Sequence, residues 1–240
     1  MFTAVGPGRP PCDWRQMFNG ILYLLKSGCQ WRMLPREFGQ WNTVYSYFKR
    51  WRTAGGWAQM REALRQGERR RQGRQEEPSA GSVDSQSIKA ATQATEVGFD
   101  GGKQVKGRKR QILVDTLGLV MAVVVTAANT DDRVGGMLLL TRYCRGGVQR
   151  LGKRWVDGGY QAEWLAQWVK DLKRTHKIAV EVTGHEGKGV QVVPWRWAVE
   201  RTFAWLLTDR RHSRDYERLT TNSEAMLQLS MIRLLLKRLA

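Results

Sequence analysis

The sequence has few cysteines and prolines, a shortage of acids and no long apolar run. Its 240 residues include only Cys12, Cys29 and Cys144, which lie far apart and never form a C-x-x-C pair. This count and spacing exclude a disulfide framework and a cysteine zinc site, so we expect reduced, packed thiols. The three histidines are equally scattered, without the spacing of a metal site, and we expect structural or surface roles for them.

The absence of an apolar stretch of about 18 residues argues against a membrane-spanning protein. The N-terminus also lacks the basic-then-apolar order of a signal peptide. The shortage of acids is more informative, because 22 Asp and Glu face 40 Lys and Arg and give a net charge of +18. Chains this basic most often bind a polyanion. The composition therefore predicts a soluble cytoplasmic protein that associates with the nucleoid and binds DNA, with no membrane partner.

Residues 1–64 are predicted to be helical. The stretch "DWRQMFNGILYLLKSGCQW" has apolar residues at three-and-four spacing, and Gly28 is a plausible C-terminal stop. Thr43 can cap a second helix, "VYSYFKRWRTAGGW". Two helices around a turn resemble a helix-turn-helix, although the pattern is as typical of an ordinary helical hairpin. The basic residues beside the second apolar face, which we expect to contact DNA, are Lys49, Arg50 and Arg52.

Residues 65–80, "RQGERRRQGRQEEPSA", have the composition of a solvated linker or a frayed helix end. They contain no apolar residue before the final Ala80 and mix Gly, Gln and charge. We therefore place a boundary between two domains here. The second domain is expected to cover 81–240.

Residues 81–240 are predicted to form an α/β domain with a mixed sheet and helices on both faces. Three strands come first, "GSVDSQSIK", "RKRQILVDTLG" and "LVMAVVVTAAN", the last two joined by a short turn with glycine. Alternating helices and strands follow, "RVGGMLLLTRYC", "KRWVDGGY", "QAEWLAQWVKDLKRTH", "KIAVEVTG" and the helix "PWRWAVERTFAWL". Three antiparallel strands followed by αβ units specify this architecture.

Three acids occupy positions that could converge at one edge of this sheet. Asp84 interrupts the first strand, Asp157 ends the fourth, and Glu200 lies on the helix after the fifth. Carboxylates brought this close repel one another unless a cation compensates, and hard oxygen ligands suit Mg²⁺ or Mn²⁺. Two such ions can activate water or a 3′-hydroxyl in phosphodiester chemistry. Glu200, the one acid in its helix, would then have a metal as its partner.

Other acids are rivals for this role. Asp115 precedes a turn at a strand end, where an ordinary turn acid is the more common reading. Asp131 and Asp132 could cap the next helix. Hydrogen bonding at a strand end is also the alternative for Asp84 and Asp157. Their mutual fit with Glu200 favours catalysis.

The basic run "KQVKGRKR" lies beside the proposed site and contains no acid. It could be a solvated approach to a strand, but we favour contact with DNA phosphates. Its basic residues are Lys103, Lys106, Arg108, Lys109 and Arg110. Trp195 and Trp197 flank Arg196 nearby, where an exposed indole could stack on an unpaired base or simply pack.

Several ordered blocks resemble the DDE transposases of bacterial insertion sequences, in the IS-five-like branch. They are "SGCQWRMLPREFGQW", "GSVDSQSIK", "GGKQVKGRKRQILVDTLGLVMAVVVTAANTDDR", "RWVDGGY", "RWAVERTFAWL" and "RDYERLTTNSEAMLQLSMIRLLLKRL". The resemblance implies an RNase H-like catalytic domain that cleaves and transfers DNA strands with Mg²⁺ or Mn²⁺, in two-ion form. It assigns the catalytic, metal-binding triad to Asp84, Asp157 and Glu200. It also implies double-stranded DNA partners, terminal inverted repeats and target DNA, and a homo-oligomer.

The chain departs from this family at two places. Relatives usually begin some tens of residues before the block that starts here near "GRPPCDW", which predicts a shortened DNA-binding region. Val193 and Leu207 replace the Tyr and Lys that the wider group often carries around the Glu, and Arg196 and Arg211 are expected to hold phosphate instead. Two alternatives stay open: an RNase H-like nuclease without strand transfer, and a DNA-binding regulator or decayed transposase without catalysis.

Overall fold

The computed structural model describes residues 13–145, 153–157, 179–183 and 194–240, with side chains for 13–145 and 197–240. The chain begins with α1 (Trp14–Ser27). The Asp13 carboxylate caps this helix by accepting from the Arg15 N–H, and Gly28 ends it in the left-handed conformation, with φ of 74°. Glycine adopts this conformation without steric cost, so the predicted stop at Gly28 is confirmed.

The second helix differs from the prediction at its start. Two 3-10 turns, η1 (Trp31–Met33) and η2 (Arg36–Phe38), lead to α2 (Trp41–Thr53). Gln40 is its N-cap, so Thr43 lies inside the first turn and the predicted Thr43 cap is wrong. The tight turn of this region instead joins α2 to α3 (Gly56–Arg71) through Gly55, which has φ of 71°.

Helix α3 continues through much of the stretch that the composition suggested was a linker. Arg65, Glu68 and Arg69 are buried, and α3 packs along the C-terminal helix α7 (Thr220–Leu239). Arg65 donates to the Glu76 carbonyl and forms an ion pair with Glu77 at 3.2 Å. The polar composition suggested a solvated segment, but these arginines are buried, where acids pair with their charge and carbonyls accept their hydrogen bonds.

A six-stranded mixed sheet follows, as predicted for the fold class. Its strands are β1 (Ala80–Lys89), β2 (Gly98–Asp100), β3 (Val105–Asp115), β4 (Val120–Ala127), β5 (Lys153–Asp157) and β6 (Ala179–Thr183). The order is β2-β3-β1-β5-β6, and β4 also pairs with β3. Strand β3 is antiparallel to β1 and β4, whereas β5 is parallel to β1 and β6. Three antiparallel strands followed by αβ units form the expected RNase H-like arrangement, and the short β2 was not anticipated.

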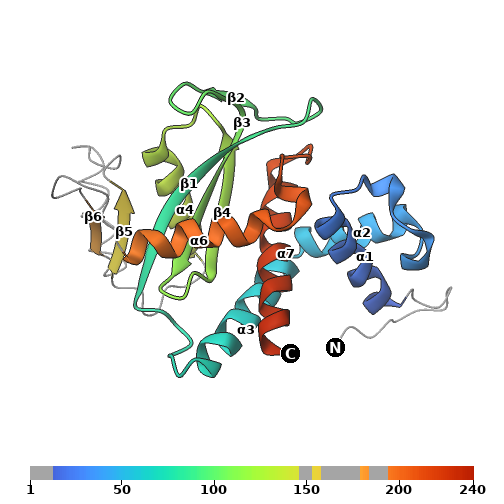
Figure 1. The fold of residues 1–240 in the computed structure, drawn as a ribbon, viewed down its shortest axis with the longest axis horizontal. Helices are drawn as coiled ribbons and strands as arrows, with labels where there is room; N and C mark the ends of the chain where they lie inside the picture. Colours follow the sequence, from blue (N-terminus) through green and yellow to red (C-terminus); the bar gives the residue numbers. More distant parts are fainter. Residues whose placement is uncertain (1–12, 146–152, 158–178, 184–193) are drawn as a thin grey trace.

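Helices cover both faces of the sheet (Figure 1). One face packs against α6 (Pro194–Leu207) and α7, and the other packs against α4 (Asp132–Arg145). The core of the first face joins Ile112 and Val114 of β3 to Val199 and Phe203 of α6. The predicted helix at 161–176 lies outside the described residues.

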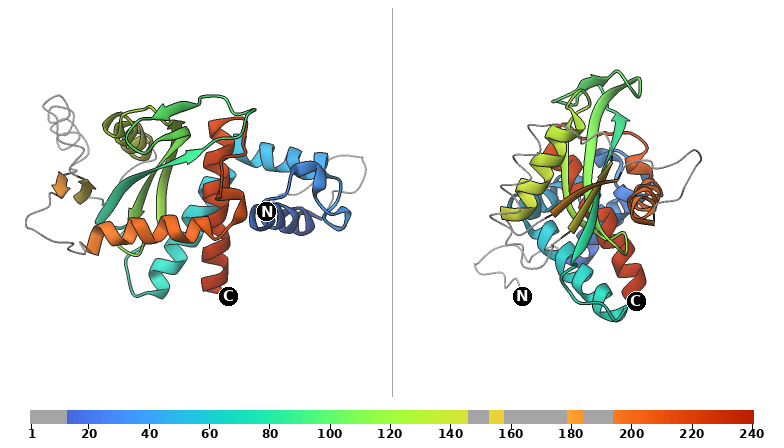
Figure 2. Two further views of the ribbon diagram at one scale, coloured as in Figure 1. Left: turned by 45° about the horizontal axis from the view of Figure 1, so that its top comes forward. Right: turned by 90° about the vertical axis from the view of Figure 1, so that its left-hand side faces the viewer.

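Helix α7 connects the N-terminal helices to the sheet. Its residues Ala225, Met226, Leu229 and Ile232 belong to the core that contains α1 and α2, whereas Leu227, Met231 and Leu235 belong to the core under the sheet. Figure 2 shows α7 between these two parts of the molecule. One helix thus presents two apolar faces to two cores.

Cys29 and Cys144 are free thiols, as predicted, and Cys12 lies outside the described residues. Within the described part of the chain, none of the helices has the length and apolar character needed to span a bilayer.

Candidate active site

Asp84 lies in the middle of β1 on the face that α6 covers. It is paired with Ile112 of β3, and directly opposed residues of an antiparallel pair share a face. Ile112 belongs to the core that includes Val199 and Phe203 of α6, which identifies that face. The Asp84 side chain is half-buried, and its Oδ1 accepts a hydrogen bond from the Ser85 N–H at 2.7 Å.

Asp157 is the last residue of β5, the strand beside β1. The parallel register pairs Ala80 with Lys153 and Ser82 with Trp155, where the ladder ends. Extending the same offset by two residues would place Asp157 opposite Asp84. Neighbouring strands lie about 4.8 Å apart. The backbone therefore brings Asp84 and Asp157 to matching positions on adjacent strands, two residues beyond their last ladder pair. The side chain of Asp157 is not among those described.

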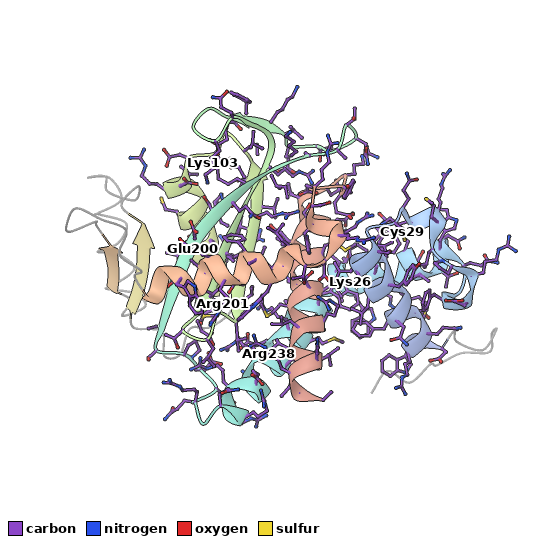
Figure 3. The ribbon with its side chains drawn as sticks, in the orientation of Figure 1. Lys26, Cys29, Lys103, Glu200, Arg201 and Arg238 are labelled. Carbon is purple, nitrogen blue, oxygen red and sulfur yellow. The ribbon has the colours of Figure 1, made fainter. Side chains whose placement is uncertain are left out.

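Glu200 comes to the same region from α6. The buried side of this helix contains Val199, Thr202, Phe203 and Leu206, and it contacts β1 and β3. Glu200 is exposed and lies near the point where α6 crosses β1 (Figure 3). Asp84 and Asp157 thus lie on adjacent strands, and Glu200 lies on the helix that contacts β1.

The donor chemistry of these three residues fits a hard divalent cation. Carboxylate oxygens are the ligands that Mg²⁺ and Mn²⁺ prefer. Among the residues whose side chains are described, no three His, Cys, Asp or Glu residues form a ligand group, and a triad with Asp157 falls outside that set. The fit rests on the strand register and on the carboxylates themselves.

Comparison with known families matches most of the chain. The family described as "Transposase DDE domain" matches residues 75–235. The chain belongs to this family. A second match, "Putative transposase of IS4/5 family", covers residues 2–61, so the two together account for both the N-terminal helices and the sheet.

Two curated proteins of Burkholderia cepacia are similar to this family member. "Insertion element IS402 uncharacterized 16.2 kDa protein" is 36% identical over 94 residues, which is 38% of this chain and 63% of that protein. "Putative transposase for insertion sequence element IS402" is 33% identical over 129 residues, which is 51% of this chain and 60% of that protein. The chain therefore spans about six tenths of the length of each of these relatives.

A solved structure, "Mos1 transposase paired-end complex with left transposon end", is also similar. It has 12% sequence identity and a TM-score of 0.29, and the match covers 76% of this chain and 62% of that one.

The rival acids have structural partners. Asp115 is fully buried, its Oδ1 accepts from the N–H groups of Leu117 and Leu119, and its Oδ2 lies 2.5 Å from Arg69 Nη1. The turn-acid interpretation of Asp115 is confirmed. Asp131 caps α4 by accepting from the Arg133 N–H, and a further bond from the Arg133 side chain lowers the pKa of Asp131 to about 2.

Four of the basic residues predicted to contact DNA are inside the protein, and these predictions are corrected. Arg108 is fully buried and donates to the carbonyls of Thr95, Glu217 and Arg218. Lys109 donates to the Thr130 carbonyl at 2.8 Å, and Arg110 donates to the His212 carbonyl at 3.2 Å. Arg211 forms an ion pair with Glu217 at 2.7 Å and also donates to the Cys29 carbonyl. All four side chains are buried and donate to acceptors of this chain, although Arg110 Nε has no acceptor among the described residues, so they offer no surface to phosphate.

The other basic candidates lie at or near the surface. The exposed ones are Lys49 and Arg50 on α2, and Lys103 and Lys106 on the hairpin of β2 and β3. Lys103 lies beside β1, with its Nζ 3.4 Å from the Ser85 carbonyl (Figure 3). Arg52 is half-buried and donates to Thr221 and Asn222 of α7. The side chain of Arg196 is not among those described.

Next to Glu200, α6 carries a stack of indoles and guanidinium groups that the sequence analysis missed. Arg201 lies over the Trp197 ring at 4.3 Å and over the Trp205 ring at 4.6 Å, and Arg238 lies over Trp205 at 4.5 Å. The signal in the sequence is the W-x₃-R-x₃-W spacing, because residues four apart share a helix face. Trp197 is 49% exposed. The side chain of Trp195 is outside the described set.

Proposed function

We propose that this chain is a transposase that cleaves DNA strands and transfers them at the ends of an insertion sequence, with Asp84, Asp157 and Glu200 as its catalytic acids. The observation that supports it most directly is the parallel register of β1 and β5, whose offset, extended by two residues, is the separation of Asp84 and Asp157. Glu200 reaches the same region from a helix. Membership of the DDE transposase family supports the same reaction.

The three carboxylates would hold Mg²⁺ or Mn²⁺, in a two-ion arrangement. When bound, such ions activate the attacking water or 3′-hydroxyl and stabilise the leaving oxygen. The chain's own contribution is to fix the three acids on two strands and one helix. A rigid scaffold of this kind keeps ligands in place more accurately than loops do.

The proposed partner is double-stranded DNA, in the form of terminal inverted repeats and of target DNA. Lys103 and Lys106 on the hairpin, and Lys49 and Arg50 on α2, are the exposed cations proposed to contact phosphates. Arg52 of α2 and Arg196 of α6 are kept as further candidates. We propose a homo-oligomer on the DNA, because two ends must be joined, and a cytoplasmic, nucleoid-associated location.

The test compares three charge-removing variants with a matched control. Glu200→Gln, Asp84→Asn and Asp157→Asn each keep the size of the side chain and remove one charge that a hard ion requires. Nicking of a duplex that carries the inverted repeats flanking the gene is measured in Mg²⁺ or Mn²⁺. Binding is measured by gel shift in chelator.

We expect nicking to fall by orders of magnitude in all three variants, with thermal stability kept and binding unchanged or slightly tighter. Asp131→Asn is the control, because it removes one charge from an exposed acid and an Asn can still cap α4. Parent-like nicking by the Glu200 variant, or an equal loss in the control, would reject the triad. Nicking without strand joining would identify a nuclease, and binding without nicking would identify a regulator.

A further inference from the structure

Ser85, the residue after Asp84, makes its polar contacts outside the strand ladder. Its N–H donates to Asp84 Oδ1 at 2.7 Å, and its hydroxyl donates to Asp132 Oδ1 at 2.7 Å. Its carbonyl accepts from Lys103 Nζ at 3.4 Å. In an antiparallel pair, alternate residues turn their backbone groups away from the partner strand. Ser85 is such a residue, so its N–H and its carbonyl point away from β3 and are bonded to Asp84 and Lys103.

Ser85 also connects the two faces of the sheet. Successive side chains of a strand point to opposite faces, so Asp84 points to the α6 face and Ser85 to the α4 face. Asp132, which receives the Ser85 hydroxyl, is the first residue of α4. The carboxylate of Asp84 is therefore linked through one residue to the helix behind the sheet.

Lys109 holds the other end of this link. Its Nζ lies 3.0 Å from Asp132 Oδ1 and 3.7 Å from Asp100 Oδ2, and it donates to the Thr130 carbonyl at 2.8 Å. Only 6% of Lys109 is exposed, and its ion pair with Asp100 is largely buried at both ends, whereas the side chain of Asp132 is 40% exposed. Ser87 joins the same group by donating to Asp100 Oδ2 at 2.5 Å.

We propose that Ser85 is a positioning residue for the Asp84 carboxylate, and that Asp132 and Lys109 hold Ser85 in place. This inference rests on the proposed function, in which Asp84 binds a divalent ion. Groups that hydrogen-bond to metal-binding carboxylates orient them, and their loss typically costs about 10- to 100-fold in metal affinity or activity. Ser85 itself makes no contact with the reacting atoms in this role. Lys109 thereby acts from the α4 face, opposite the face on which Asp84 lies.

The first test is the matched pair Ser85→Ala and Ser87→Ala in the full chain. Both changes remove one hydroxyl from the same face of β1, and both hydroxyls donate to a carboxylate paired with Lys109. Of the two serines, only Ser85 also donates its backbone N–H to Asp84. Binding of Mn²⁺ without DNA is measured by calorimetry, and neither change alters the net charge.

Ser85→Ala keeps the backbone N–H that donates to Asp84 and removes only the hydroxyl that anchors Ser85 to Asp132. We therefore expect it to weaken Mn²⁺ binding by about three- to tenfold, at the low end of the effect of losing such a group, and Ser87→Ala to leave Mn²⁺ binding unchanged. Ser85→Thr keeps the hydroxyl and should bind Mn²⁺ within about twofold of the parent. Melting temperatures are compared in chelator, because a merely structural role would lower stability without this pattern of affinities. Equal Mn²⁺ affinity of the two alanine variants would overturn the role of Ser85.

A second pair of variants tests the hydrogen bond between Ser85 and Asp132 from the α4 side, in case Ser85→Ala does not fold. Asp132→Ala and Asp131→Ala each remove one charge at neighbouring positions, and only Asp132 accepts from Ser85. We expect the larger loss of Mn²⁺ affinity from Asp132→Ala, and equal losses would count against the inference.

Asp84→Asn separates the inference from the proposed function. If it abolishes Mn²⁺ binding while the serine variants behave alike, the metal site stands and the positioning role fails. If Asp84→Asn binds Mn²⁺ as the parent does, the metal site itself is wrong, and the inference fails with it.

Discussion

The turn between β2 and β3, with the first residues of β3, carries basic side chains similar to those later in β3 but in the opposite environment. Lys103 and Lys106 are exposed on the hairpin, whereas Arg108, Lys109 and Arg110 are buried only a few residues later. Each of the three buried cations donates to a backbone carbonyl of another segment. Burial also lowers the pKa of Arg110 to about 10. One basic run can therefore contain both exposed cations that are candidates for DNA contact and buried cations that stabilise the fold. The net charge of the chain overstates the number of cations available to DNA.

The buried arginines act as connectors. Arg108 joins β3 to the loop before β2 through Thr95 and to the segment before α7 through Asp215 and Glu217. A guanidinium has five N–H donors in a fixed plane, which suits several acceptors at once. The exposed lysines of the hairpin have flexible stems and compact charges, which suits contact with a mobile phosphate backbone.

The largest effect on stability should come from replacing one of the buried cations of β3. Arg108→Met keeps much of the apolar stem but removes the buried ion pair of Asp215 and the donor to the carbonyls of Thr95, Glu217 and Arg218, so we expect a loss of roughly 3–5 kcal/mol in the free energy of unfolding. Lys106→Met, two residues earlier and exposed, should change it by less than about 0.5 kcal/mol. Urea unfolding measures both. Similar losses from both would contradict the division into buried and exposed cations.

Two acids, buried Asp115 and exposed Glu200, extend the comparison between structural and functional charges. Asp115→Asn retains an acceptor for Leu117 and Leu119 but removes the charge that faces Arg69, and we expect a loss of about 2–3 kcal/mol in unfolding free energy. Nicking by the folded fraction should match the parent at low temperature. Glu200→Gln should show the reverse, with stability kept and nicking lost. Loss of nicking from Asp115→Asn at full stability would place Asp115 in the chemistry.

The sheet was predictable because its strands have strong local signals. The apolar run of β4 and the turn at Gly118, with φ of 78°, indicate a hairpin without any tertiary information. The position of Asp157 at a strand end was predictable from the glycines that follow it, whereas Asp84 lies within β1 and Glu200 lies on α6, and it was the family resemblance that singled out these three acids. What the residues alone could not supply was the pairing of β1 with β5, because a parallel register depends on contacts between distant segments.

The fate of the basic residues was not predictable from their local pattern. A strand buried on both faces usually reads as a continuous apolar run, and the start of β3 is basic instead. Its neutralising partners come from Thr95, Thr130, His212 and Asp215, which are 13 to 107 residues away. The full extent of α3 was not predictable for the same reason, because its buried arginines pair with acids outside the helix. Arg65 pairs with Glu77 in the segment that follows, and Arg69 pairs with Asp115 at the end of β3.

The exposed side of the comparison predicts a salt effect. Lys103→Ala with Lys106→Ala should remove up to two phosphate contacts, each of which contributes a slope of about 0.9 in log affinity against log salt. Between 50 and 200 mM salt, the parent should then lose about tenfold more affinity than the double variant. Arg74→Ala with Lys237→Ala removes the same charge from exposed positions on other elements. Identical slopes for the two double variants would move the DNA path away from the hairpin.

The smallest expected effect concerns His212, which lies among the buried cations. Burial lowers its pKa well below the ordinary value of 6.5, and Arg110, Arg211 and Arg233 lower it further, against a bond from the backbone of Met226. Its Nε2 lies 2.7 Å from the Ser230 hydroxyl, which itself donates to Asp209. Neutral His212 has a single ring N–H, which it donates either to the Ser230 hydroxyl or to the backbone of Met226.

The sign of the pH effect follows from the lowered pKa. Below pH 6.5 the unfolded chain takes up a proton at His212 that the folded chain does not, so the free energy of unfolding falls as the pH falls. Between pH 7 and 5.5 this contribution should reach about 1 kcal/mol. His212→Gln keeps a donor for Ser230 and removes the titration, so its stability should depend less on pH over this range by the same amount. Unfolding of both proteins in urea at pH 7 and 5.5 measures the difference, and equal pH dependence would show that His212 is protonated in the folded protein.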